Sequence, residues 1–138
     1  MTMMTNLSFD LPFPPSVNTY YRSSFRSRSV YLSKKGREFH QLALVELRGF
    51  LSDAGTSSDS IVPSFPTERL RIIVELIPGN RRSFDIDGRL KALLDTMEGY
   101  IYTNDSQVDE LEVIRKPMEK GRARCRVTIC EIKEPLNS

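Results

Sequence analysis

Two aspartates and a lysine stand close together near the middle of the chain, in a segment that begins at Ser83 and reads SFDIDGRLK. Asp85 and Asp87 are two residues apart, and Lys91 follows four residues after Asp87. Carboxylates at this spacing repel each other unless a cation lies between them. Carboxylate oxygens are ligands that Mg²⁺ and Mn²⁺ prefer. The segment therefore predicts a divalent-metal site that holds Mg²⁺, with Mn²⁺ able to replace it.

Asp105 is the third predicted metal ligand. It lies in a loop, Tyr-Thr-Asn-Asp-Ser-Gln, ahead of an apolar strand. A loop that folds back over the start of the helix after Asp87 would bring Asp85, Asp87 and Asp105 together. Lys91 would then lie beside a phosphate oxygen and stabilise the negative charge of the transition state. These four residues are the predicted catalytic set for metal-dependent hydrolysis of a phosphodiester, in which the ion polarises the phosphate and activates water.

The same residues also have ordinary structural interpretations. An aspartate at a helix start commonly caps the helix. Asp87 and Lys91 have the spacing of a helical ion pair, which contributes about 0.3–0.5 kcal/mol. Asp105, followed by serine, is typical of a turn. Asp109 and Glu110 are interpreted as charges on a strand surface, and they are lesser candidates for metal ligands. Spacing alone does not separate these alternatives.

Positive charge is concentrated in two parts of a chain whose net charge is only +2, and no acidic residue occurs between Leu11 and Arg37. Clustered cations suit a polyanion better than a neutral small molecule, although a solvated face is the alternative. The predicted contacts to a DNA backbone are Arg22, Arg26, Arg28, Lys34, Lys35, Arg81 and Arg82. A second basic cluster spans residues 115–126. The candidates for stacking on exposed bases are Tyr20, Tyr21, Phe25 and Phe84.

The composition excludes several other classes of protein. With 138 residues, 39% hydrophobic and 28% charged, the chain is expected to form one globular domain over residues 1–138. No apolar run approaches the roughly 20 residues of a membrane span, and the N-terminus lacks the features of a signal peptide. With one histidine, His40, and two cysteines, the chain has no Cys/His zinc spacing. His40 falls within the first predicted helix and is interpreted as a surface or partly buried residue rather than as the base of a Ser-His-Asp triad. There is also no P-loop and no glycine-rich dinucleotide fingerprint.

The two cysteines indicate the compartment. Cys125 and Cys130 are five residues apart in a predicted strand, so their side chains point to opposite faces and do not pair. Free thiols suit a reducing environment. We therefore expect a cytoplasmic protein.

The periodicity of apolar residues predicts the elements that position the candidate site. Strands are expected over residues 7–11, over 70–77, from about 108, and over about 123–132. Helices are expected over residues 34–51, with Ser33 as the N-cap, and over about 86–97, closed by Gly99. A basic loop or hairpin is expected within about 16–37, and a polar, mobile linker over about 52–67. The strand at 70–77 is apolar on both faces and is expected in the sheet interior, covered on both sides.

This order, β-α-β-α-β-β, predicts an α/β (α+β) fold in which a single mixed sheet of about four strands packs with two helices. The sequence also resembles one family. The segment LPFPPSVNTYYR, from Leu11 to Arg22, is similar to the P-P-S-x-N-x-Y-x-R signature of the RusA-type Holliday-junction resolvases. The segment RRSFDIDGRLKALLD, from Arg81, resembles their R-R-x-x-D-x-D-N-x-x-K block, and NDSQV, from Asn104, resembles their D-D-x-Q-V block. The resemblance runs from about Leu7 to Glu131.

The resemblance implies a Mg²⁺-dependent endodeoxyribonuclease of a bacterium or phage. Such an enzyme forms a homodimer and makes paired, symmetric cuts across a four-way DNA junction. The family's catalytic carboxylates fall on Asp85, Asp87 and Asp105, and its lysine falls on Lys91. Two positions depart from the pattern: Gly88 replaces the usual asparagine, and Asn104 replaces the first aspartate of the third block.

Two rival functions remain open from the sequence. One is a DNA-junction-binding or architectural protein with impaired catalysis, for which Gly88 and Asn104 would be the signs. The other is a Mg²⁺-dependent phosphohydrolase that acts on a nucleotide, with the basic loops in dimer contacts.

Overall fold

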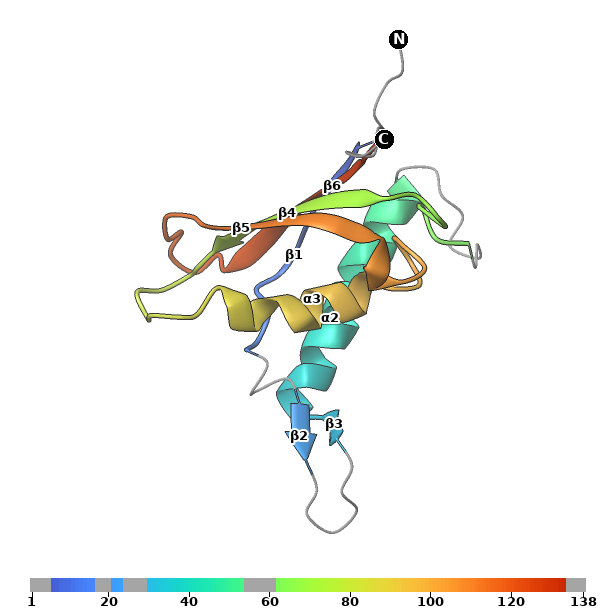
Figure 1. Cartoon of the computed structure of the whole chain (residues 1–138). Coiled ribbons are helices and arrows are strands. Elements are labelled where there is room, and N and C mark those ends of the chain that lie inside the picture. The colour runs from blue at the N-terminus through green and yellow to red at the C-terminus, as the bar shows by residue number, and fades with distance from the viewer. Residues whose placement is uncertain (1–5, 17–20, 24–29, 54–61, 134–138) are drawn as a thin grey trace.

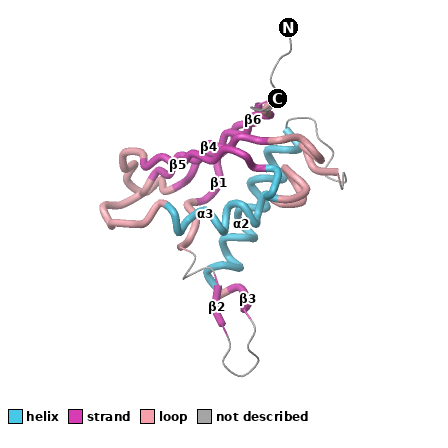
Figure 2. Tube along the Cα trace, viewed as in Figure 1, coloured by secondary structure: helices cyan, strands magenta, loops and turns pink. Residues whose placement is uncertain are grey.

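The computed structural model describes residues 6–16, 21–23, 30–53 and 62–133, and its centre is a four-stranded sheet (Figure 1). The strands lie in the order β1-β6-β4-β5, with bounds β1 Asn6–Pro12, β4 Leu70–Ile77, β5 Val108–Arg115 and β6 Arg124–Glu131. β4 and β5 are parallel, whereas the other neighbouring pairs are antiparallel. The two helices, α2 Lys34–Asp53 and α3 Leu90–Met97, lie on the same side of this sheet (Figure 2). The predicted α+β fold and order of elements are confirmed.

Strand β4 carries the centre of the core, but the prediction that both its faces are covered is wrong. Leu70, Ile72, Val74 and Leu76 are completely buried on the helix side. On the other side Arg71 is exposed and forms ion pairs with Glu110 and Glu112 of β5. Because helices lie on only one side, opposite charges on neighbouring strands stabilise the outer face, and half-buried Ile73 lies among them.

Helix α2 begins where the sequence predicts. The Ser33 hydroxyl oxygen accepts a hydrogen bond from the Gly36 backbone N–H at 2.9 Å, which is the geometry of an N-cap. The helix continues to Asp53, so its end lies two residues beyond the predicted one. Its buried residues, Gly36, Phe39, Ala43, Leu47 and Leu51, recur at helical spacing and pack against the sheet. Within the described ranges, no helix has the length and apolar character that a membrane span requires.

A short hairpin extends from the N-terminal end of α2, away from the sheet (Figure 1). Its antiparallel strands are β2 Tyr21–Ser23 and β3 Val30–Leu32. The hairpin interpretation of this basic segment is therefore confirmed, although the loop ends at Ser33 rather than at Arg37 because α2 begins at Lys34. The remaining candidates in this segment, Tyr20, Phe25, Arg26 and Arg28, lie outside the described residues.

The expectation of a polar linker over about 52–67 is wrong at both ends. Ser52 and Asp53 belong to α2. Phe65 is 2% exposed, and its backbone N–H donates a hydrogen bond to the Ile101 carbonyl at 2.7 Å. The Phe65 side chain thus anchors residues 62–67 to the core. The polar composition of the segment does not predict this contact.

This anchor predicts a stability difference. We expect Phe65→Ala to lower the free energy of unfolding by about 3–5 kcal/mol, because it leaves a cavity where a buried ring was. Urea unfolding followed by circular dichroism measures the change. Leu42→Ala is the control, since Leu42 is 59% exposed on α2 and its truncation is expected to cost about 0.5 kcal/mol or less. Equal effects of the two substitutions would contradict the packing described here.

Candidate active site

Asp85 and Asp87 lie ahead of α3, in the segment that leads into it. Asp87 opens a short 3₁₀ helix, η1 Asp87–Arg89, and α3 follows at Leu90. Neither aspartate is the N-cap of either helix, and no side-chain capping bond forms at Ile86 or Arg89, the two N-caps. One Asp87 carboxylate oxygen accepts only the backbone N–H of Gly88, at 2.9 Å. The capping interpretation therefore does not apply, and both carboxylates are exposed.

Lys91 forms an ion pair within α3, but not with Asp87. Its ammonium nitrogen lies 3.2 Å from a carboxylate oxygen of Asp95, one turn along the helix. The structural alternative, an ion pair between Lys91 and Asp87, does not form, because α3 begins only at Leu90 and Lys91 pairs with Asp95 instead. The Lys91 side chain is 51% exposed, and an exposed pair of this kind contributes little to stability. The ammonium group is thus free to leave Asp95 for a phosphate.

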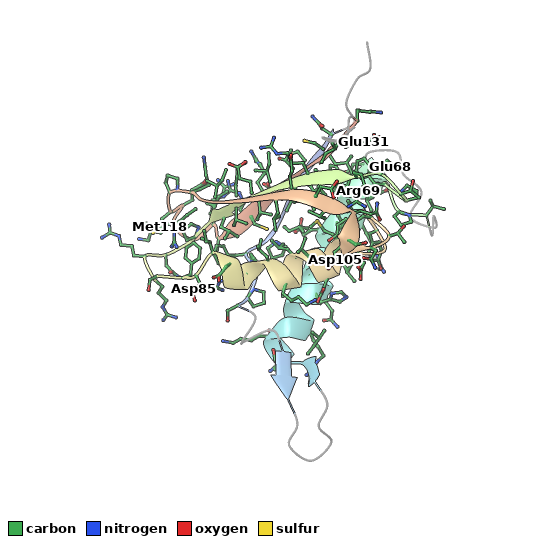
Figure 3. The ribbon with its side chains drawn as sticks, in the orientation of Figure 1. Glu68, Arg69, Asp85, Asp105, Met118 and Glu131 are labelled. Atoms are coloured by element: carbon green, nitrogen blue, oxygen red, sulfur yellow. The ribbon has the colours of Figure 1, made fainter. Side chains whose placement is uncertain are left out.

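Asp105 lies at the opposite end of α3, beyond its C-terminus. Its backbone N–H donates a hydrogen bond to a carboxylate oxygen of Glu98, the C-cap of α3, at 3.1 Å. The labels of Asp85 and Asp105 in Figure 3 stand at the two ends of the helix. An eight-residue helix is roughly 12 Å long, so the backbone positions of Asp85 and Asp105 lie about one helix length apart.

The predicted convergence of three carboxylates is therefore wrong within one protomer. The described residues contain no group of three acidic, histidine or cysteine side chains that could hold a metal ion. Asp85 and Asp87 still fit Mg²⁺, because this ion commonly binds one or two carboxylates and keeps several waters. Asp105 is exposed, so another molecule can reach it. The lesser candidates Asp109 and Glu110 form ion pairs with Arg69 and Arg71, as expected of strand-surface charges.

Gln107 holds the Asp105 turn in place. It closes the second 3₁₀ helix, η2 Asp105–Gln107, and is 6% exposed. Its side-chain oxygen accepts the backbone N–H groups of Thr103 and Asn104 at 2.9 and 3.0 Å. Its side-chain nitrogen donates to the carbonyls of Phe65 and Glu68, both at 2.9 Å. One buried carboxamide thus joins the Asp105 turn to the anchored segment 62–67, with all four of its bonds satisfied.

Tyr102 fixes the same turn to α3. The ring is fully buried, and its hydroxyl donates a hydrogen bond to the Leu94 carbonyl at 2.6 Å. Burial raises the pKa of Tyr102 far above its usual value, and the nearby carboxylates of Asp105, Glu98 and Asp95 raise it further. The phenol therefore remains a donor, and acidic side chains gather at this end of α3. The sequence did not predict a role for Asp95 or Glu98. Their spacing from Lys91 along the helix is the only sequence signal that points to them.

The predicted DNA-binding cations whose side chains are described are exposed at two places, the turn before α3 and the start of α2. Arg81 and Arg82 are exposed in the turn before Asp85, and Lys34 and Lys35 are exposed at the start of α2. Arg22 lies in β2, where only the backbone is described. The second predicted basic cluster is divided, because Arg124 and Arg126 form ion pairs with acidic side chains.

Phe84, a stacking candidate, is half-buried and packs against neighbouring side chains. Its ring lies edge-on to Phe13 with centroids 5.2 Å apart, and the Arg115 guanidinium carbon is 4.3 Å from the ring centre. The Arg89 guanidinium lies near both rings, 5.5 Å from the centre of Phe13 and 5.7 Å from that of Phe84. We call these four residues the arginine–phenylalanine cluster. The side chain of Tyr21, another stacking candidate, is not described.

Comparison with known proteins places these features in one family. The family model described as Endodeoxyribonuclease RusA matches residues 12–130. A crossover junction endodeoxyribonuclease of Enterobacteria phage HK97 is 34% identical over 131 residues, which cover 93% of this chain and 98% of the relative. The relatives of the same name in Enterobacteria phage 82 and Escherichia coli strain K12 are each 28% identical over 130 residues, covering 94% of this chain and 98% of each relative.

The bonds of Gln107 predict its importance for the Asp105 turn. We expect Gln107→Ala to lower the free energy of unfolding by about 2–4 kcal/mol, because four backbone groups lose their buried partner. Thermal and urea unfolding measure the loss. Gln41→Ala, an exposed position of α2, is the matched control with an expected change of about 0.5 kcal/mol or less. A Gln107→Ala variant as stable as the Gln41→Ala variant would argue against this role.

Proposed function

The chain belongs to the RusA family of endodeoxyribonucleases, and we propose on this premise that it resolves Holliday junctions by paired, symmetric cuts in four-way DNA. The observation that carries the proposal is the family match, which includes the segment of the two uncapped carboxylates, Asp85 and Asp87. The curated relatives in phages and in Escherichia coli bear the name of crossover junction endodeoxyribonucleases. An enzyme that acts on DNA in such hosts would work in the cytoplasm.

Asp85 and Asp87 would hold Mg²⁺, or Mn²⁺ in its place. When bound, such an ion polarises the scissile phosphate and lowers the pKa of the attacking water. The exposed carboxylates accept no ion pair from the described residues, so their oxygens are available as ligands. Lys91 exchanges its weak contact with Asp95 for a phosphate oxygen and steadies the charge that develops there.

Asp105 would join this site from a second copy of the chain. Within one protomer it lies beyond the far end of α3 from Asp85 and Asp87, so its predicted role as a ligand requires a partner. A homodimer with twofold symmetry also suits a junction that has two equivalent strands to cut. The acidic end of α3 in one copy would then lie near the basic end in the other.

The exposed cations would bind the DNA backbone. Arg81 and Arg82 precede the metal-binding pair, and Lys34 and Lys35 lie in the first turn of α2. The helix dipole does not stabilise cations at the N-terminus of a helix. A phosphate bound there is attracted by the dipole and by the cations together. Together with Arg22, Arg26 and Arg28 of the hairpin segment, they supply a sequence-independent attraction that weakens as salt rises.

The two departures from the family pattern leave this chemistry in place. A side chain at Gly88 would meet no atom within 4 Å, so the glycine leaves open space rather than a packing requirement. The Asn104 side chain accepts the Ser106 backbone N–H at 2.9 Å and caps the turn that carries Asp105. Neither position removes one of the three carboxylates or Lys91.

A nicking assay tests the metal site. We expect Asp87→Asn to lower Mg²⁺-dependent cleavage of a labelled four-way junction by roughly 10²–10³-fold, since a metal site contributes several kcal/mol to the transition state. Junction binding without metal should persist. Glu112→Gln, which removes an exposed carboxylate on the outer face of the sheet, is the control and should cleave normally. Binding without any nicking by the wild type would favour an architectural protein, and turnover of nucleotides alone would favour a phosphohydrolase.

Mixing two inactive variants tests the shared site. If Asp105 acts across the dimer, a mixture of Asp85→Asn and Asp105→Asn protomers contains heterodimers with one intact site, so single-strand nicking should return. A mixture of Asp85→Asn with Asp87→Asn should stay inactive, because each site then lacks one ligand from its own chain. Denaturing electrophoresis of the nicked junction measures both mixtures. Inactivity of the first mixture, with heterodimers present, would place Asp105 outside a shared site.

A further inference from the structure

A cavity of about 360 Å³ lies beside the segment that carries Asp85, on the side of the turn after β4. Asn80, Arg82 and Ser83 form its polar lining, and Phe13 and Phe84 form apolar walls. Arg89 also lines it. None of the four predicted catalytic residues belongs to this lining, so the cavity is a feature separate from the metal-binding pair.

The Arg89 guanidinium is held firmly in the cavity wall. One of its terminal nitrogens donates a hydrogen bond to the Pro14 carbonyl at 3.1 Å, and the group lies near both rings of the arginine–phenylalanine cluster. Its Nε is buried and has no hydrogen-bond partner. A cation held this way is poorly compensated, which favours binding of an anion.

The other guanidiniums around the cavity are also without ion pairs. Among the described residues, Arg82, Arg89 and Arg115 form no salt bridge, whereas Arg69, Arg71, Arg124 and Arg126 on the sheet all do. Arg115 instead covers Phe84, donating to its carbonyl at 2.9 Å. The arginines on the sheet are therefore held by carboxylates in direct ion pairs, whereas Arg82 and Arg89 in the cavity lining are not.

The turn that frames the cavity is fixed before any ligand arrives. The Asn80 side-chain oxygen accepts the Arg82 backbone N–H at 2.9 Å. Gly79 packs so closely on the start of β6 that a Cβ atom there would lie 2.9 Å from the Ala123 nitrogen. Such preorganisation lowers the entropy lost when a ligand binds.

We propose that this cavity binds a backbone phosphate of the DNA strand next to the cut, with Arg82 and Arg89 as the residues that contact it. Guanidinium groups pair with phosphate through two parallel hydrogen bonds, and the apolar walls strengthen that attraction by excluding water. The sugar of the same nucleotide packs against Phe13. Arg115 is a positioning residue, since it acts through Phe84. This subsite rests on the proposed function and adds to it a contact that orients the strand relative to Asp85 and Asp87.

Kinetics with matched arginine variants test the subsite. We expect Arg89→Met and Arg82→Met each to raise the KM for a four-way junction about tenfold to hundredfold, the loss of one charge-assisted contact, with kcat nearly unchanged. The slope of log affinity against log salt should fall by about one for each variant. Arg71→Met removes the same charge from an ion pair on the sheet and should change KM less than about twofold.

Separate results overturn the subsite and the proposed function. If the wild type nicks junctions but Arg82→Met and Arg89→Met match Arg71→Met, the subsite is wrong while the function stands. If the wild type does not nick, the function itself fails. Arg82 is exposed, so Arg82→Met keeps the test valid should Arg89→Met fail to fold.

Nuclear magnetic resonance identifies the source of the phosphate. Inorganic phosphate and a junction should both shift the backbone amides of Ser83 and Ala123 in the wild type, and much less in Arg89→Met. Shifts caused by the mononucleotide dTMP but not by the junction would overturn the assignment to DNA. An absence of shifts with every probe would overturn the subsite.

Discussion

Burial of one face of α3 fixes where every candidate catalytic group lies. Ala92, Leu93 and Met97 are almost completely buried against the sheet, so the helix can neither rotate nor slide. Lys91 is consequently left on the exposed side, with the aspartate pair before the helix and Asp105 beyond it. The length of this one helix sets the distance between the carboxylates. Within one protomer the aspartate pair and Asp105 therefore lie at opposite ends of the helix, which is the observation behind the proposal that a second copy completes the site.

Different kinds of side chain hold the two ends of α3 in place. At the Asp105 end, a neutral carboxamide and a protonated phenol satisfy backbone groups and tolerate the acidic side chains around them. At the Asp85 end, the arginine–phenylalanine cluster holds the chain through guanidinium groups that lie against aromatic rings and donate to backbone carbonyls. The helix therefore separates a negative end from a positive end. In the function proposed above, this polarity suits antiparallel pairing of two copies and the approach of DNA to the end that carries Arg82.

The elements were predictable from the sequence, whereas their contacts were not. Alternation at residues 7–11 and 70–77 and the spacing of apolar residues in both helices identified the sheet and its two helices. The anchor at Phe65 was hidden because a single aromatic residue leaves no periodic signal. The separation of Asp105 from Asp85 depends on the path of the loop after α3, which Tyr102 and Gln107 fix through contacts with residues distant in sequence. Local spacing carries no information on such contacts.

The described arginines fall into two groups. Those in ion pairs hold neighbouring strands together, and those without an ion pair are available to bind a ligand. The run from 115 to 126 has the appearance of one basic cluster in the sequence. Strand register pairs Arg126 with Asp10 on β1, more than one hundred residues away in the chain, and thereby neutralises it. Arg115 occupies the helix side of an edge strand, where it meets an aromatic ring instead of a carboxylate. Because the partner of each arginine is decided by register, the positive charge that remains at the Asp85 end is a property of the fold rather than of composition.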